Sequence, residues 1–142
     1  MTAKEYLEQP KVLREEIRKD KDRIASMRSI VENCTTHLSF TAGCDPSKNK
    51  AAFEDVMLDI TEAEAALEEK VKRLAETEFE ILEMICSLSE IKQQTILQMR
   101  YLEDMKWGEI ANQLILSKPY IYEIHREALE EFERIFQKHS KT

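Results

Sequence analysis

The chain of 142 residues is long enough for one domain, or for one small domain with an extension. It contains 2 Gly and 3 Pro, and 35% of its residues are charged, a composition that predicts few turns and an all-α fold. The net charge of −7 excludes non-specific attraction of the whole molecule to nucleic acid, and it also excludes a basic membrane-binding patch. With three cysteines, no signal-like N-terminus and no long apolar run, we expect a soluble cytoplasmic protein that makes no contact with a membrane.

The first predicted element is a long helix over residues 4–38. Its apolar residues recur at the three- and four-residue intervals of a heptad seam, with Asp20 in the one vacant position. A loop-like segment with Gly, Asp, Pro and Asn follows at residues 41–50. The members of this first seam are Leu13, Ile17, Ile24, Met27, Val31, Cys34 and Leu38.

A second seam predicts a second long helix after the loop, with Glu64 and Glu78 in core positions. Two seamed helices joined by a short loop form an antiparallel, coiled-coil-like hairpin. Because a two-helix hairpin buries only part of each stripe, we expect self-association into a dimer or a higher oligomer. The alternative is a hairpin that packs back onto its own C-terminal domain. The second seam consists of Phe53, Met57, Ile60, Leu67, Val71, Leu74, Ile81 and Ile85.

The heptad pattern ends near Cys86. Ser87 and Glu90 have the spacing of a capping box, and Cys86 and Ile91 can form the apolar pair across it. This arrangement predicts a helix that begins at Ser87 and ends near Leu102, followed by a turn. The residues that this helix would turn inward are Ile91, Ile96, Leu97 and Tyr101.

Charge also differs between the two parts of the chain. Residues 88–142 carry eight basic and nine acidic side chains, so six of the seven excess negative charges lie in the first 87 residues. This asymmetry supports a division into a helical hairpin at residues 1–86, expected to oligomerise, and a second domain at residues 87–142.

Residues 107–129 have the spacing of a helix-turn-helix. Apolar residues of a short helix at 107–114 fall on one face, and Ser117 stands where the N-cap of a second helix is expected, with its hydroxyl free to accept a backbone N–H. Pro119 is tolerated in the first turn of that helix, because first-turn N–H groups have no intrahelical partner. The side chains left outward are Lys118, Pro119, Tyr120, Tyr122, Glu123 and Arg126.

A wider pattern includes this motif and the helix before it: Ile96-Leu97-Gln98-Met99-Arg100-Tyr101-Leu102, Trp107-Gly108-Glu109-Ile110-Ala111, Leu114, Ser117 and Ala128-Leu129. The pattern resembles region 4 of sigma-70 factors. It is still more similar to the sigma-region-4-like regulators of phages and prophages of Gram-positive bacteria, which include the ArpU-type late-gene activators. The resemblance covers about residues 87–136. It implies a transcriptional regulator that binds promoter DNA, with RNA polymerase as a second partner.

The resemblance also implies roles for individual residues. Residues 107–114 would form the supporting helix, and residues 117–126 the recognition helix in the major groove. Glu123 can accept a hydrogen bond from a cytosine amino group, and Lys118 can donate to guanine or to a phosphate. Arg100 and Lys106 would hold the DNA backbone. The residues that would face bases and phosphates are Lys118, Pro119, Tyr120, Tyr122 and Glu123, with Arg126 one turn further along.

Three residues depart from the family pattern. Ile115 stands where Gly is usual, which restricts the turn, and Lys106 replaces the usual N-cap Ser or Thr. Pro119 lacks a backbone donor that could hold a phosphate. Since the second domain is nearly neutral, one copy should bind DNA weakly, and a second copy or a protein partner such as RNA polymerase is then required.

Other kinds of site fit the sequence less well. Cys34, His37 and Cys44 could hold zinc, but their spacing differs from that of a standard finger. His125 and His139 have no nucleophile or carboxylate at a catalytic spacing, so we expect neither an enzyme nor a cofactor. The alternative function is a non-enzymatic interaction protein, either an anti-regulator or a phage packaging subunit, that uses the helix-turn-helix fold for protein contacts.

Overall fold

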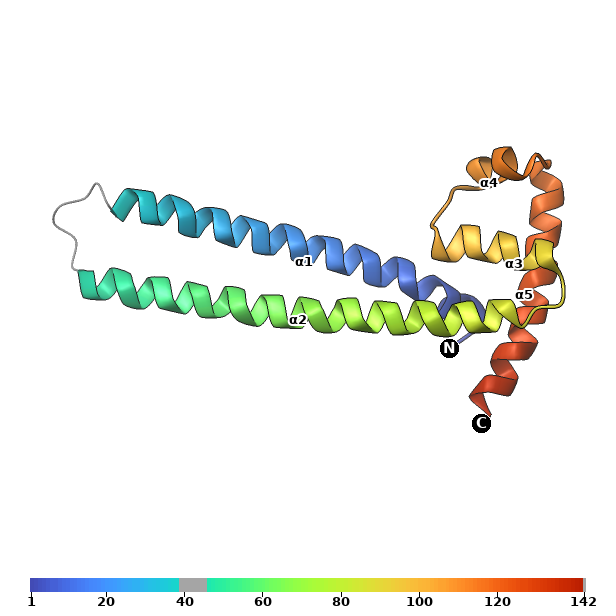
Figure 1. Ribbon diagram of the computed structural model, residues 1–142, viewed down its shortest axis with the longest axis horizontal. Coiled ribbons are helices and arrows are strands. Elements are labelled where there is room, and N and C mark those ends of the chain that lie inside the picture. The colour runs from blue at the N-terminus through green and yellow to red at the C-terminus, as the bar shows by residue number, and fades with distance from the viewer. Residues whose placement is uncertain (39–45, 142) are drawn as a thin grey trace. The chain divides into compact units, whose positions relative to one another are not determined.

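The computed structural model describes residues 1–38 and 46–141, with side chains for residues 1–33 and 51–141. All regular elements within these ranges are helices, so the described chain is all-α, as expected. In chain order the elements are α1 (Ala3–Leu38), α2 (Pro46–Cys86), α3 (Ile91–Leu97), η1 (Gln98–Leu102), α4 (Trp107–Leu114) and α5 (Lys118–Ser140) (Figure 1).

Internal contacts divide the chain into two compact units. The first unit, which we call the head, consists of Met1–Arg14 and Leu74–Thr142. The second, which we call the arm, is Glu15–Arg73. The head therefore contains the first turns of α1 and the last turns of α2 together with α3, η1, α4 and α5.

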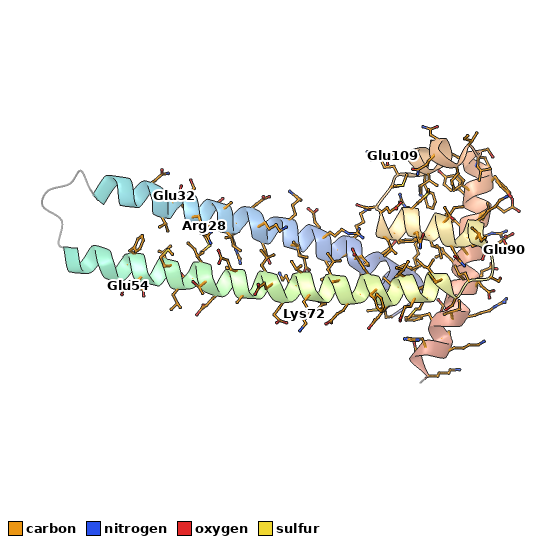
Figure 2. All side chains as sticks on the ribbon, in the orientation of Figure 1. Arg28, Glu32, Glu54, Lys72, Glu90 and Glu109 are labelled. Atoms are coloured by element: carbon orange, nitrogen blue, oxygen red, sulfur yellow. The ribbon has the colours of Figure 1, made fainter. Side chains whose placement is uncertain are left out.

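In the arm, α1 and α2 lie side by side and run antiparallel (Figure 1). Lys70 Nζ lies 2.7 Å from Asp20 Oδ2, and this ammonium holds the pKa of Asp20 below its usual range. Arg28, labelled in Figure 2, pairs with Glu64. Within the arm, Asp20 interrupts the first seam and Glu64 the second, and each is paired with a cation from the other helix. Among the arm residues whose side chains are described, Ile17, Ile24 and Ile60 are the buried apolar ones.

The core of the head consists of two apolar clusters along α5. In the first, Phe132 on α5 is fully buried against the last turns of α2 and the first turns of α1, where Leu7 is also fully buried. The rings of Tyr6 and Phe136 lie 5.3 Å apart at the edge of this cluster. The second cluster joins α3, η1 and α4 to the first half of α5 and contains Ile96, Met99, Ile110, Ala111, Ile121 and Ile124.

Arg14 closes the C-terminal end of η1, a wide helical turn in which the Glu103 N–H donates to the Gln98 carbonyl at 2.9 Å. Arg14 Nη2 donates to the Leu102 carbonyl at 2.7 Å and lies 3.0 Å from Glu78 Oε1. The last carbonyls of a helix have no intrahelical donor, and the guanidinium supplies one here. Glu78, the second acidic residue in a seam position, is thereby paired as well.

The predicted helix start after Cys86 is wrong. α2 continues to Cys86, and α3 begins only at Ile91, with Glu90 at its N-cap and no capping hydrogen bond from a side chain. Ser87 Oγ donates instead to the Glu83 carbonyl at 3.1 Å, which ties it to the last turn of α2 and leaves no capping box. Ile91, predicted to face inward, is 78% exposed.

Candidate nucleic-acid interface

The carboxylate of Glu109 stabilises the first turn of α4. Lys106 occupies the N-cap with extended backbone angles, and its N–H donates to Glu109 Oε2 at 3.2 Å. Glu109, labelled in Figure 2, therefore supplies half of a capping box, and its charge lies near the positive end of the helix dipole. The lysine ammonium is only a donor and cannot supply the other half.

The turn between α4 and α5 takes a left-handed conformation at Ile115, with φ 57° and ψ 47°. This geometry ends α4, and the Leu116 N–H closes the turn by donating to the Ala111 carbonyl at 3.1 Å. The Ile115 side chain is 89% exposed, so it gains little from burial. A β-branched residue thus adopts a positive φ at the position where the sigma-region-4-like proteins usually have glycine, at a cost of about 1–2 kcal/mol.

Ser117 stands at the N-cap of α5, as predicted, and its carbonyl accepts the Ile121 N–H at 3.1 Å. Its hydroxyl makes no capping hydrogen bond, so the predicted role of that group is wrong. Pro119 occupies the second helical position and has no N–H, which removes one of the two donors that an N-cap hydroxyl can reach.

The first half of α5 presents an exposed polar and aromatic face. The opposite, buried side of these turns packs against α4. Ile110 and Ala111 of α4 lie there in one cluster with Ile121 and Ile124 of α5. A Cβ added at Gly108 would lie 3.8 Å from Lys118 Cε, so the lysine side chain lies across the first turn of α4. All six α5 side chains predicted to lie outward are exposed, and Glu127 is exposed beside them: Lys118, Pro119, Tyr120, Tyr122, Glu123 and Arg126.

A lysine from α3 joins this face. Lys92 Nζ donates to Tyr120 Oη at 3.3 Å and lies 5.5 Å from the centre of the Tyr120 ring. The contact depends on the packing of α3 against α5. Nothing in the local sequence around Lys92 indicates it, and sequence reasoning missed this residue.

Behind this face, Trp107 links the exposed residues to the interior. Its ring meets Tyr122 edge-on at 5.3 Å and His125 at 4.7 Å. The Arg100 guanidinium lies 4.6 Å from the Trp107 ring, and its Nη1 donates to the Met105 carbonyl at 3.0 Å. Arg100 is therefore engaged inside the head, whereas Lys106 is exposed at the start of α4.

His125 and Tyr101 form a hydrogen-bonded pair, with His125 Nε2 and Tyr101 Oη 2.8 Å apart. Burial, together with the charges of Lys4 and Arg100, lowers the pKa of His125 to about 4. Burial and the charge of Glu8 raise the pKa of Tyr101 to about 12. Both groups are thus uncharged at neutral pH, and their arrangement is that of a structural pair that orients the Trp107 ring.

The possible zinc ligands Cys34, His37 and Cys44 lie outside the residues whose side chains the structure describes. Elsewhere, among the described side chains, no three His, Cys, Asp or Glu residues gather closely enough to hold a metal ion. In the part of the chain that is described, no helix combines the length and the apolar character needed to cross a membrane.

A family model described as "Protein of unknown function (DUF1492)" matches residues 45–133. The matched range contains all of α2, α3, η1 and α4, and α5 as far as residue 133. No curated protein and no solved structure matches the chain.

Proposed function

The chain belongs to the DUF1492 family of proteins of unknown function, and we propose that it is a transcriptional regulator whose helices α4 and α5 form a DNA-binding helix-turn-helix. The observation that carries the proposal is the exposed face on the first half of α5. Six consecutive or near-consecutive side chains there are solvent-accessible, while the opposite face of the same turns is buried against α4. A recognition helix needs both properties, because one face enters the major groove and the other fixes its position.

The resemblance to sigma region 4 and to the phage and prophage regulators supports the same function. In those proteins, a helix equivalent to α5 reads double-stranded DNA. The side chains on the exposed face have the required chemistry, since Glu123 can accept from cytosine, Lys118 can donate to guanine or to a phosphate, and tyrosine rings can contact thymine methyl groups. Lys92, placed beside Tyr120, adds a further cation for a phosphate.

Charge limits the affinity of one copy. Near the proposed face, the cations Lys92, Lys118 and Arg126 are offset by acidic groups that include Glu123 and Glu109. Since phosphate neutralisation provides most of the non-specific binding energy, we propose that a second copy or a protein such as RNA polymerase holds the head on its site.

The arm is the segment that we propose for self-association. Its internal ion pairs satisfy the polar seam positions, but apolar side chains remain outside the two-helix seam: Ile30 is 59% exposed and Leu58 is 57% exposed. A partner that covers them would gain their burial. Light scattering at tens of micromolar tests this step, and a monomeric mass would exclude it.

Selection of bound sequences from random double-stranded DNA tests the main proposal. We expect enrichment of a defined site, and we expect Lys118→Ala and Glu123→Ala to change the base preference while circular dichroism stays unchanged. Lys72→Ala, on α2 of the arm (Figure 2), is the matched control and should select the same site as the parent chain. Absence of enrichment at low salt would contradict the proposal.

The exposed turn favours one second candidate. Ile115 presents an almost fully exposed apolar side chain next to the same face, a feature more usual in protein contacts than in contacts with phosphates. If no DNA site is enriched, an interaction protein that uses the turn and α5 for a protein partner becomes the better assignment.

A further inference from the structure

A cavity of about 370 Å³ lies in the head, between the first turns of α1 and a wall made by η1, the turn after it, α4 and α5. Its size falls within the range of about 300–1,000 Å³ that is usual for small-molecule sites. The cavity is distinct from the exposed face of α5, because none of the six outward residues of that face lines it. The residues that matter for its chemistry fall into a charged group and an aromatic group.

The charged group contains more positive than negative side chains. Lys4 and Lys11 come from α1 and Arg100 from η1, while Glu8 and Asp104 are the acids. None of these five forms an ion pair with another described residue. In the arm, by contrast, the charges at the seam are paired across the two helices. The cavity therefore offers three cations that no carboxylate of the described chain neutralises directly.

The aromatic group also lines the cavity. It consists of Trp107, His125 and Tyr101, held together by the ring contacts and the 2.8 Å hydrogen bond described above. His125 is neutral at pH 7, so it adds a polar group without adding to the positive charge. Val12 adds an exposed apolar side chain from α1 to the lining. A planar ring could thus make apolar contacts with both Trp107 and Val12.

We propose that this cavity binds a small aromatic anion of about the size of a nucleoside monophosphate, with Lys4 and Lys11 holding the anionic group and Trp107 contacting the ring. A rigid aromatic wall with a few convergent polar groups is the usual construction of such a site. Charge-assisted hydrogen bonds from two lysines would fix the anionic end.

The same cavity has a physical connection to the proposed DNA-binding face. Trp107 lines the cavity and also meets Tyr122, an exposed residue of α5, at 5.3 Å. A ligand that shifts the Trp107 ring would therefore shift Tyr122 and alter DNA affinity. This regulatory step rests on the proposed function, whereas ligand binding itself does not.

Tryptophan fluorescence provides the test, because Trp107 is the only tryptophan in the chain. The full chain, without DNA, is titrated with AMP, GMP, CMP, UMP and salicylate, and with adenosine as the uncharged comparison. We expect a saturable change with at least one anion and none with adenosine. Lys4→Gln combined with Lys11→Gln should weaken binding of that anion about tenfold. Both lysines are exposed, so the double variant should keep its far-UV circular dichroism.

Lys118→Gln is the matched control, since it removes a cation from the face of α5 and should leave the titration unchanged. The site is excluded if no anion gives a saturable change, if adenosine binds as well as AMP, or if the double variant binds as tightly as the parent. Loss of binding in Lys118→Gln alone would place the anion on the α5 face and would also overturn the proposal. Because DNA is absent, failure to bind DNA cannot be confused with failure of this site.

Discussion

Tyr101 Oη and His125 Nε2 lie 2.8 Å apart and join η1 to α5 through a single hydrogen bond. The rings of the two residues are stacked, with their centres 5.8 Å apart, and the edge of His125 also meets Trp107. The imidazole of His125 therefore contacts both η1, through Tyr101, and the first residue of α4, Trp107. Its protonation state is consequently coupled to the stability of the whole head.

The first prediction concerns pH. The pKa of His125 is lowered to about 4 in the folded chain, against about 6.5 in an unfolded one. The unfolded state therefore binds the extra proton first as the pH falls, so this contribution to stability is complete above pH 6.5 and is lost progressively between pH 6.5 and 4. Because His125 is only partly buried, we expect a total loss of about 1–2 kcal/mol. Urea unfolding of the parent chain between pH 7 and 5 measures the larger part of this loss, and the remainder falls below pH 5.

His125→Gln is the informative variant, since glutamine can keep a hydrogen bond to Tyr101 but does not titrate. Its free energy of unfolding should change less between pH 7 and 5 than that of the parent. Equal pH dependence in the two proteins would show that other groups cause the loss.

The second prediction concerns the turn at Ile115. Replacement by glycine relieves the left-handed strain and gives up little buried surface, so Ile115→Gly should raise the free energy of unfolding by about 1 kcal/mol. Ile91→Gly is the control, because Ile91 is also exposed but lies at the start of a helix with ordinary backbone angles. That variant should lose about 0.5–1 kcal/mol. Destabilisation by both substitutions would mean that Ile115 makes a favourable contact in solution.

The third prediction concerns the first turns of α1. Leu7 is fully buried in the same cluster as Phe132, so Leu7→Ala should lower the free energy of unfolding of the head by about 2–5 kcal/mol. Val12→Ala, at an exposed position on the same helix, should change it by less than about 0.5 kcal/mol. We also expect a fragment of residues 87–142 to unfold without cooperativity, because it lacks the side chains that cover Phe132. Sharp cooperative unfolding of this fragment would contradict the dependence on α1.

The sequence predicts those features of the fold that depend on residues close together along the chain, and not those that depend on residues far apart along it. The two long helices, the short helix at residues 107–114 and the start of the helix after Ser117 follow from apolar periodicity and from cap positions, which are local signals. The positions of Asp20 and Glu64 in the seams are also visible in the sequence. Their partners Lys70 and Arg28 are not, because they are set by the register between two helices.

The same distinction explains the errors. The spacing of Ser87 and Glu90 matches a capping box, but α2 runs on to Cys86 and takes the serine hydroxyl into its own last turn. Leu7 and Phe132 come from opposite ends of the chain but belong to one buried cluster, and no periodicity within either helix indicates this. For the candidate site, sequence reasoning identified the outward side chains of α5, but the contribution of α3 required the packed structure.

The fourth prediction follows from that contribution. Lys92 Nζ is held beside Tyr120 on the proposed DNA-binding face. If it contacts a phosphate, Lys92→Ala should weaken binding to all duplex sequences alike, and the slope of log K against log salt should become shallower by about 1. Fluorescence anisotropy with a labelled duplex at several salt concentrations measures both quantities. Lys92→Arg should keep the slope of the parent, and Lys72→Ala, on the arm, serves as the control for a general change in charge. An unchanged slope in Lys92→Ala would show that α3 stays clear of the DNA backbone, and a change in base preference would mean that Lys92 acts by positioning Tyr120.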